Sequence, residues 1–130
     1  MPMPETLHPI LVLDDEERVR GLLMDYLSEC DEFELFGAGS GEEALEILRQ
    51  RPAALCVVDL RLPGMDGVEF IGSAAAEKLC HHFLVHTGSV DFAVSQSLKD
   101  LGMVQKDVFY KPVDAAEILA RIRTLLKQGD

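Results

Sequence analysis

The chain has 130 residues, of which 48% are hydrophobic and 27% are charged, and its formal net charge is −11. This length and balance predict one globular domain with a single core and exclude a disordered chain, and no apolar run reaches the roughly 18 residues that a membrane helix needs. The acidic excess argues against direct binding to nucleic acid or to an anionic membrane, because both select lysine and arginine.

The start of the chain and its cysteines bear on where the protein works. Residues 1–8 are expected to form a flexible lead without the basic and apolar regions of a signal peptide, and residues 9–128 a single domain. Cys30, Cys56 and Cys80 are widely spaced and lack a C-x-x-C pair, which argues against a disulfide framework and a zinc knuckle. We therefore expect a cytoplasmic protein in which Cys56 packs in the core.

Short apolar runs alternate with amphipathic segments in the first half of the chain. Residues 10–13 predict a buried strand, and residues 32–36, where polar and apolar side chains alternate, predict an edge strand. A helix should follow each strand, the second with Ser40 as its N-cap and Glu43 completing a capping box. The residues at helical spacing are Val19, Leu22, Leu23, Tyr26 and Leu27 in the first helix and Ala44, Leu45 and Leu48 in the second.

The apolar run at residues 55–58 stops at Asp59, and a Pro-Gly and an Asp-Gly turn signal follow it. A run this short predicts a fully buried strand that delivers one carboxylate to the carboxyl edge of a sheet. An Asp-Gly turn accounts for Asp66 without any chemistry. The helix expected after this loop has Val68, Ile71 and Ala75 on its inner face.

Residues 83–86 and 108–110 predict the last two strands, which lead to Thr87 and to Lys111. A weak helix is expected between these strands, and a strongly amphipathic helix capped by Asp114 closes the chain. The apolar positions are Val94, Leu98 and Leu101 in the weak helix and Ile118, Leu119, Ile122, Leu125 and Leu126 in the last one.

Three histidines, His81, His82 and His86, lie around the fourth predicted strand. His82 and His86 point to the same face of a strand, at a separation too long for easy chelation of one metal ion. We therefore interpret all three as surface or packing residues.

Five strands that alternate with five helices predict an α/β fold, with a parallel sheet covered by helices on both faces. The default for this count is a flavodoxin-like three-layer sandwich with strand order 2-1-3-4-5. In that order the carboxyl ends of strands 1, 3, 4 and 5 share one edge of the sheet. The side chains that follow these four strands are Asp14 and Asp15, Asp59, Thr87, and Lys111.

Three carboxylates within about 5 Å of one another would repel by roughly 3 kcal/mol per pair at an effective dielectric constant near 20. Lys111 supplies one positive charge, which does not balance Asp14, Asp15 and Asp59. A divalent cation supplies the rest, and an all-oxygen ligand set favours Mg²⁺. A hard cation, an ammonium group and a hydroxyl around a free carboxylate form a phosphoryl-transfer site, with Asp59 as its nucleophile.

Four motifs carry a resemblance to a known family: L-D-D-E at residues 13–16, V-V-D-L-R-L-P-G-M-D-G at 57–67, H-T-G at 86–88 and Y-K-P at 110–112. Together they resemble the receiver domain of two-component response regulators, from about residue 10 to residue 126. The resemblance implies that Asp59 accepts a phosphoryl group from a phosphohistidine on a sensor histidine kinase or a histidine phosphotransfer protein.

The same resemblance assigns a metal site. Asp15, Asp59 and the backbone carbonyl of Arg61 would bind Mg²⁺ directly. Asp14 would help to hold the ion through water. Mg²⁺ is the only cofactor that the resemblance implies.

The resemblance also implies roles at the other two strand ends. Thr87 would hydrogen-bond the phosphoryl oxygens, and Lys111 would pair with them beside a cis Lys111-Pro112 peptide bond. The chain would then be a signalling receiver rather than an enzyme, and it would switch a downstream effector protein or domain. No direct nucleic-acid or membrane binding is expected, and homodimerisation is left open.

Two other functions stay open from the sequence. A degenerate receiver would bind its partners without phosphorylation, although the acids, Thr87 and Lys111 are all present. A phosphatase of the haloacid dehalogenase type also uses an aspartate nucleophile, Mg²⁺, a hydroxyl residue and a lysine. That family has a second aspartate two residues after its nucleophile, where this chain has Arg61.

The sequence departs from the receiver pattern near the fifth strand. Many receivers carry Tyr or Phe three residues before the lysine, where this chain has Val108. Tyr110 shares the face of Val108 by strand periodicity. The preceding segment, residues 98–107, is also about two residues longer than usual. We therefore expect phosphorylation to shift this face of the domain without a large aromatic rotamer change.

Overall fold

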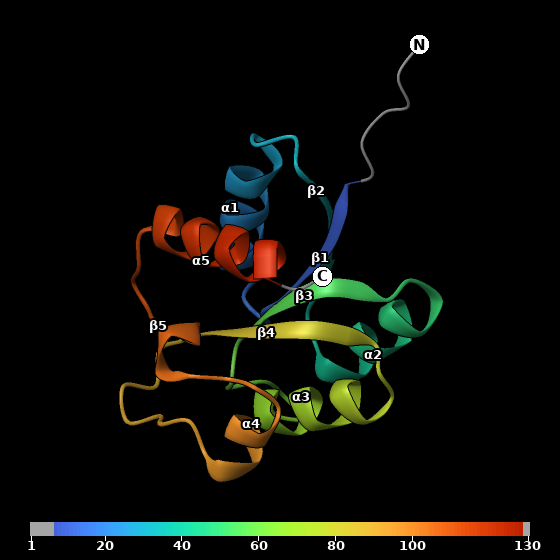
Figure 1. Cartoon of the computed structure of the whole chain (residues 1–130), viewed down its shortest axis with the longest axis vertical. Helices are drawn as coiled ribbons and strands as arrows, with labels where there is room; N and C mark the ends of the chain where they lie inside the picture. Colours follow the sequence, from blue (N-terminus) through green and yellow to red (C-terminus); the bar gives the residue numbers. More distant parts are fainter. Residues whose placement is uncertain (1–6, 129–130) are drawn as a thin grey trace.

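A computed structural model describes residues 7–128 and shows a parallel sheet between two layers of helices (Figure 1). The strand order, β2-β1-β3-β4-β5, is the predicted one. Residues 1–6 of the predicted lead lie outside the described residues, and His8 at its end already belongs to a strand. The strands are β1 (His8–Leu13), β2 (Phe33–Ala38), β3 (Ala53–Val58), β4 (Cys80–Thr87) and β5 (Val108–Tyr110).

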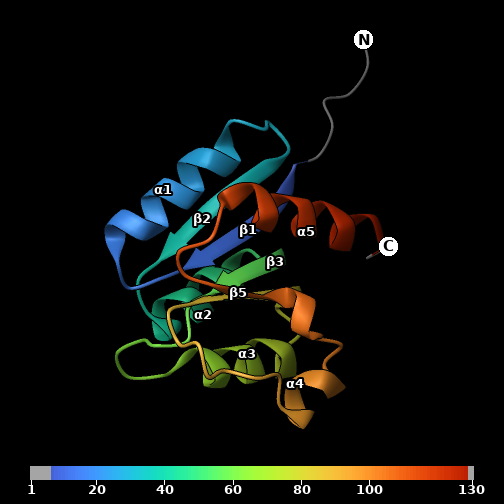
Figure 2. The same cartoon turned by 90° about the vertical axis from the view of Figure 1, so that its left-hand side faces the viewer.

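The helices divide between the two faces of the sheet. They are α1 (Glu17–Ser28), α2 (Gly41–Gln50), α3 (Gly67–Ala76), α4 (Gln96–Asp100) and α5 (Ala115–Gln128), with a short 3-10 helix η1 (Gln105–Asp107) before β5. Helices α1 and α5 cover one face, and α2, α3 and α4 cover the other (Figure 2). None of the helices within residues 7–128 is long and apolar enough to cross a membrane.

Strand β3 is buried on both faces, which explains its unbroken apolar run. Cys56 and Val58 belong to the core under α2, α3 and α4, whereas Leu55 and Val57 belong to the core under α1 and α5. None of these four side chains is more than 2% exposed. Cys56 is therefore the core residue that the sequence predicts, and the strand that carries Asp59 is fixed from both sides.

Side-chain caps mark the starts of helices α2, α3 and α5. Ser40 Oγ accepts a hydrogen bond from Glu43 N–H (3.2 Å), so the predicted N-cap of α2 is confirmed. The Glu43 carboxylate accepts from Gly39 N–H (2.7 Å) rather than from Ser40 N–H, so the predicted capping box is displaced by one residue. Asp66 forms a complete capping box at the start of α3, and Asp114 accepts a backbone N–H at the start of α5 (2.9 Å).

The inner face of α3 differs from the predicted one. Its buried residues are Gly67, Phe70, Ile71 and Ala74, whereas Val68 is exposed and Ala75 is half-buried. Of the three predicted positions, only Ile71 is fully buried. Gly67 lets the first turn of the helix pack directly against the backbone after β3. This contact turns Phe70 rather than Val68 towards the core.

Helix α4 is shorter than the predicted weak helix. Leu98 is buried, but Leu101 is 44% exposed and Val94 precedes the helix. The helix ends early because Gly102 adopts a φ of 93°, and Met103 N–H then donates to Leu98 O (3.1 Å) in a Schellman-type ending. Met103 takes the buried position that the sequence pattern assigns to Leu101.

Gly67→Ala is expected to lower the free energy of unfolding by about 1–3 kcal/mol, as overpacking of a well-packed site does. A Cβ at residue 67 would lie 2.4 Å from Asp59 O and 2.8 Å from Leu60 Cα, so the backbone under the candidate site must shift. Urea unfolding measures the effect. Gly72→Ala in the same helix is the matched control, because nothing lies within 4 Å of its Cβ position. Equal stabilities of the two variants would contradict the prediction.

Candidate functional site

The register of the sheet places the acids of two strands side by side. Leu13 of β1 pairs with Val58 of β3, so the residues that follow them, Asp14 and Asp59, leave the sheet as neighbours. Carboxylate oxygens of Asp14, Asp15 and Asp59 lie within 4.8 Å of one another. The structure thus brings together the three acids that the sequence predicts at this edge.

Lys111 lies between the two buried acids of this cluster. Its Nζ donates to Asp14 Oδ2 at 2.8 Å and to Asp59 Oδ2 at 3.3 Å. Its backbone N–H donates to Thr87 O (2.7 Å), which extends the pairing of β4 with β5 by one residue. The Lys111-Pro112 peptide bond is cis, as predicted. The ammonium group therefore bridges the ends of β1 and β3 from the end of β5.

The pKa values of this ion pair shift for different reasons. Burial raises the pKa of Asp59, and the charge of Asp14 adds to this, while Lys111 opposes it. Burial alone would lower the pKa of Lys111, but its hydrogen bond to Asp14 and the charges of both acids raise it above its ordinary value. One ammonium group is thus too little to offset the cost of two buried carboxylates.

A cavity of about 440 Å³ opens beside this ion pair. Its lining residues are Asp15, Glu16, Asp59, Arg61, Gly88 and Lys111. Arg61 N–H donates to Asp59 Oδ1 (3.4 Å), which directs the carboxylate towards the loop after β3. The exposed carboxylate of Glu16 lies 4.0 Å from Lys111 Nζ. Glu16 and Gly88 are additions to the residues that the sequence predicts at this site.

Thr87 lies behind the cavity rather than in its lining. The residue is fully buried at the end of β4, and its Oγ1 accepts a hydrogen bond from Ser89 N–H (3.0 Å). Ser89 Oγ in turn accepts from Arg61 Nε (2.8 Å). The structure therefore connects the threonine to the loop after β3 through Ser89, a residue that carries no signal in the sequence.

The histidines of residues 7–128 are not part of the acidic cluster. Within this range the group that could hold a metal ion is formed by Asp14, Asp15 and Asp59 and includes no histidine. His81 is exposed and His82 is half-buried, whereas His86 is buried at the end of β4. Burial and the charge of Lys111 lower the pKa of His86 to about 4, so its ring is neutral at pH 7.

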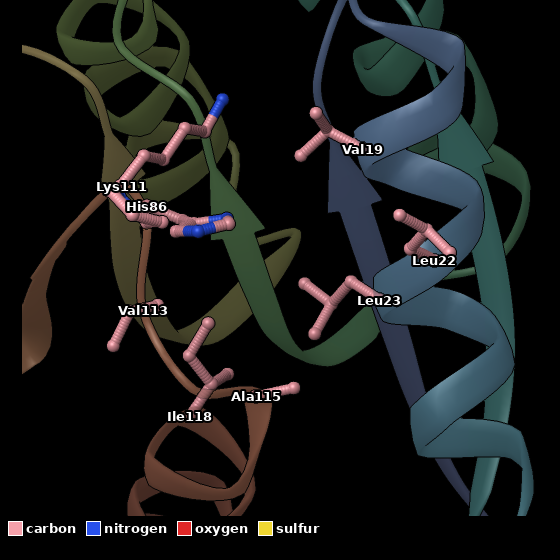
Figure 3. A pocket seen from close by; sticks show the side chains of 9 residues that line it. Val19, Leu22, Leu23, His86, Lys111, Val113, Ala115 and Ile118 are labelled. Carbon is pink, nitrogen blue, oxygen red and sulfur yellow. The ribbon is translucent and has the colours of Figure 1, made fainter.

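A second cavity, of about 290 Å³, lies between α1 and the segment that joins β5 to α5 (Figure 3). Val19, Leu22 and Leu23 form its wall on α1, and the other wall is formed by His86, Lys111, Pro112, Val113, Ala115 and Ile118. Leu22 is 61% exposed at its rim. Lys111 lines this apolar cavity as well as the acidic one, so the two cavities adjoin at that side chain.

Tyr110 and Val108 pack on the same face of β5, as strand periodicity predicts. Val108 is buried, and Tyr110 Oη donates to Phe92 O (2.8 Å) and accepts from Gln105 Nε2 (3.0 Å). Tyr110 thus ties the loop after β4 to β5. That its ring stays in place on phosphorylation remains a prediction.

The chain matches known proteins over most of its length. The family model described as "Response regulator receiver domain" matches residues 10–123. The transcriptional regulatory protein SrrA of Staphylococcus aureus is 32% identical over 121 residues, which are 92% of this chain and 48% of SrrA. The chain therefore spans about half the length of the curated relatives that it matches.

Solved structures share the fold. The REC domain of AraT, a response regulator from Geobacillus stearothermophilus, is 31% identical with a TM-score of 0.77, over 95% of this chain and 98% of that chain. The response regulator protein TrrA from Thermotoga maritima, solved in complex with Mg(2+)-BeF, is 26% identical with a TM-score of 0.77. That match covers 92% of this chain and 99% of the TrrA chain.

Proposed function

Because the chain belongs to the family of response regulator receiver domains, we propose that it is a phospho-accepting receiver of a two-component phosphorelay. In this proposal residues 9–128 form the receiver, and Asp59 takes a phosphoryl group from a phosphohistidine. The observation that carries the proposal is the placement of Asp59, which is 5% exposed, 3.3 Å from Lys111 and beside a second buried acid.

The residues of the site have the chemistry that this transfer needs. An Asp59 oxygen attacks the phosphorus while the bond from phosphorus to the donor imidazole breaks, so that an acyl phosphate and a free imidazole result. Lys111 lies where its charge can pair with an oxygen of the incoming group. Thr87 Oγ1 only accepts a hydrogen bond within residues 7–128, so its proton is available to a phosphoryl oxygen.

The acidic cluster fits Mg²⁺. Its carboxylate oxygens are hard, anionic and within 4.8 Å of one another, and two of the three acids are buried. We assign Asp15, Asp59 and the Arg61 backbone carbonyl as direct ligands and Asp14 as a ligand through water. When bound, the ion would neutralise negative charge on the phosphoryl group as it transfers.

The apolar cavity suits the phosphohistidine donor, a sensor histidine kinase or a histidine phosphotransfer protein. An apolar side chain of the donor would enter between α1 and the segment after β5, beside the exposed Leu22 (Figure 3). Because Lys111 lines both cavities, a donor seated there would bring its phosphohistidine next to the acidic cavity.

We propose that the output is a change in protein–protein contacts, directed at an effector protein or a further domain. The curated relatives are named as transcriptional regulators and are about twice as long, so any nucleic-acid contact would belong to such a further part. The three cysteines are free thiols, which is consistent with our proposal of a cytoplasmic protein.

Intact-mass measurement after incubation with acetyl phosphate and Mg²⁺ tests the proposed function. A receiver gains one phosphoryl group per chain, and Asp59→Asn, which keeps the shape of the side chain but not its nucleophilic oxygen, gains none. Multiple turnover of small phosphate esters would instead indicate a phosphatase of the haloacid dehalogenase type. The absence of both gain and turnover would indicate a degenerate receiver.

A further inference from the structure

The Asp14–Asp15 peptide joins the two acids at the end of β1, and every polar group of Asp14 is hydrogen-bonded. Its N–H donates to a carbonyl of β2 (3.1 Å), its Oδ1 accepts from Glu16 N–H (2.9 Å) and its Oδ2 accepts from Lys111 Nζ (2.8 Å). Its carbonyl oxygen accepts from Arg20 Nη1 at 2.6 Å. Arg20, one turn into α1, therefore supplies the bond that sets the rotation of this peptide.

Asp15 depends on that rotation more than Asp14 does. Its side chain is exposed, and its carboxylate makes no hydrogen bond or ion pair with another residue in the range 7–128. We infer that Arg20 is a positioning residue for the metal site: by holding the Asp14 carbonyl it directs the Asp15 carboxylate towards Asp59. The inference rests on the proposed function, because it concerns the same acidic cluster.

The Arg20 side chain passes beside two glycines of the chain after β1. A Cβ at Gly37 would lie 3.2 Å from Arg20 Cδ and 2.8 Å from Met24 Sδ, and a Cβ at Gly39 would lie 3.5 Å from Arg20 Nη1. Neither glycine has a positive φ, so the backbone does not require glycine at these positions. The 3.5 Å at Gly39 is an ordinary van der Waals distance, so only Gly37 limits the space beside Arg20, and this limit is independent of the hydrogen bond itself.

Charge and position predict opposite effects of removing Arg20. A guanidinium group beside the acidic cluster repels a divalent cation, so its loss would strengthen Mg²⁺ binding if charge alone mattered. Loss of a group that orients metal ligands instead weakens binding, typically by about 10–100-fold. The direction of the change in Mg²⁺ affinity therefore separates the two roles.

Arg20→Met is the test variant, because it keeps a long side chain and removes the hydrogen bond. Arg18→Met removes an exposed arginine from the same helix and is the matched control. Calorimetric Mg²⁺ titration without a phosphodonor should show about tenfold weaker binding for Arg20→Met and little change for Arg18→Met.

Gly37→Ala provides a second arm that keeps the charge of Arg20 and crowds its side chain, because the new Cβ would lie 3.2 Å from Arg20 Cδ. It should also weaken Mg²⁺ binding, whereas Gly21→Ala in α1, with nothing within 4 Å of its Cβ position, should not. Equal or tighter Mg²⁺ binding by Arg20→Met would overturn the inference, whatever the effect of Gly37→Ala. So would a lower melting temperature in EDTA with no change in Mg²⁺ affinity, since that marks a purely structural role. Failure of the unchanged chain to bind Mg²⁺ would instead overturn the proposed metal site, and the positioning role with it.

Discussion

Lys111→Met is expected to lower the free energy of unfolding by about 3 kcal/mol at pH 7 without Mg²⁺, the low end of the cost of breaking a buried ion pair. The side chains of Asp14 and Asp59 are 4% and 6% exposed, and the ammonium group is the cation that both contact. Its removal leaves two buried carboxylates facing each other. We take the low end because the adjoining cavity admits water to one side of the pair.

The size of this loss should depend on pH and on Mg²⁺. Burial raises the pKa of Asp59 and Lys111 opposes this rise, so protonation of Asp59 becomes easier when Lys111 is removed. The stability difference between the variant and the unchanged chain should therefore shrink as the pH falls below 7. Mg²⁺ should recover much of the lost stability, because the ion replaces the missing charge.

Urea unfolding in EDTA and in Mg²⁺, at pH 7 and pH 5, measures these effects. Lys111→Arg keeps the charge and should lose much less stability than Lys111→Met. Lys99→Met removes an exposed lysine and should change stability little. A Lys111→Met chain as stable as the unchanged one in EDTA at pH 7 would show that the ammonium group does not offset the buried acids.

The sequence predicts the strands and the acidic cluster well because both follow from strong local patterns. A strand buried on both faces must be an unbroken apolar run, and the residue after such a run must lie at the sheet edge, as Asp59 does. Strand order then places the ends of β1, β3, β4 and β5 together without any knowledge of side-chain packing. The position of the acidic cluster could therefore be predicted from where apolar runs end.

Features that depend on packing between distant segments could not be predicted in this way. Hydrophobic spacing assigns Val68 to the core. In the structure Gly67 packs against the Asp59 backbone, and the helix is rotated so that Phe70 is buried instead. The spacing also extends α4 to Leu101, which the positive φ of Gly102 prevents. In the sequence, Arg20 cannot be told from any other helical arginine. Only the structure shows that its side chain runs beside Gly37 to the Asp14 carbonyl.

His86 shows the same limit for electrostatics. Its place at the end of a predicted strand indicates a packing residue, and the structure confirms that it is buried. Its lowered pKa, however, depends on burial between α1 and the segment that joins β5 to α5, and on the charge of Lys111, which follows another strand. Sequence spacing holds no information about either cause.

When the pH falls from 7 to 4, the free energy of unfolding of the unchanged chain is expected to fall by about 3 kcal/mol more than that of His86→Gln. The reason is that the pKa of His86 is lowered to about 4 in the folded chain. A histidine whose pKa is lowered by folding stabilises the folded chain at pH values above its pKa in the unfolded chain, which is near 6.5. That contribution is lost as the pH falls towards the folded value.

Paired denaturation curves of the unchanged chain and His86→Gln between pH 7.5 and pH 4 measure this difference. Asp59, whose raised pKa acts in the opposite direction, is present in both chains and cancels in the comparison. The gap between the two curves should open mainly below pH 6.5, where charging of His86 would place a second cation beside Lys111 in the wall of the apolar cavity. A constant difference between the stabilities of the two chains over this pH range would contradict the prediction. It would mean that His86 becomes charged while it stays in its site, and that the cavity tolerates the charge.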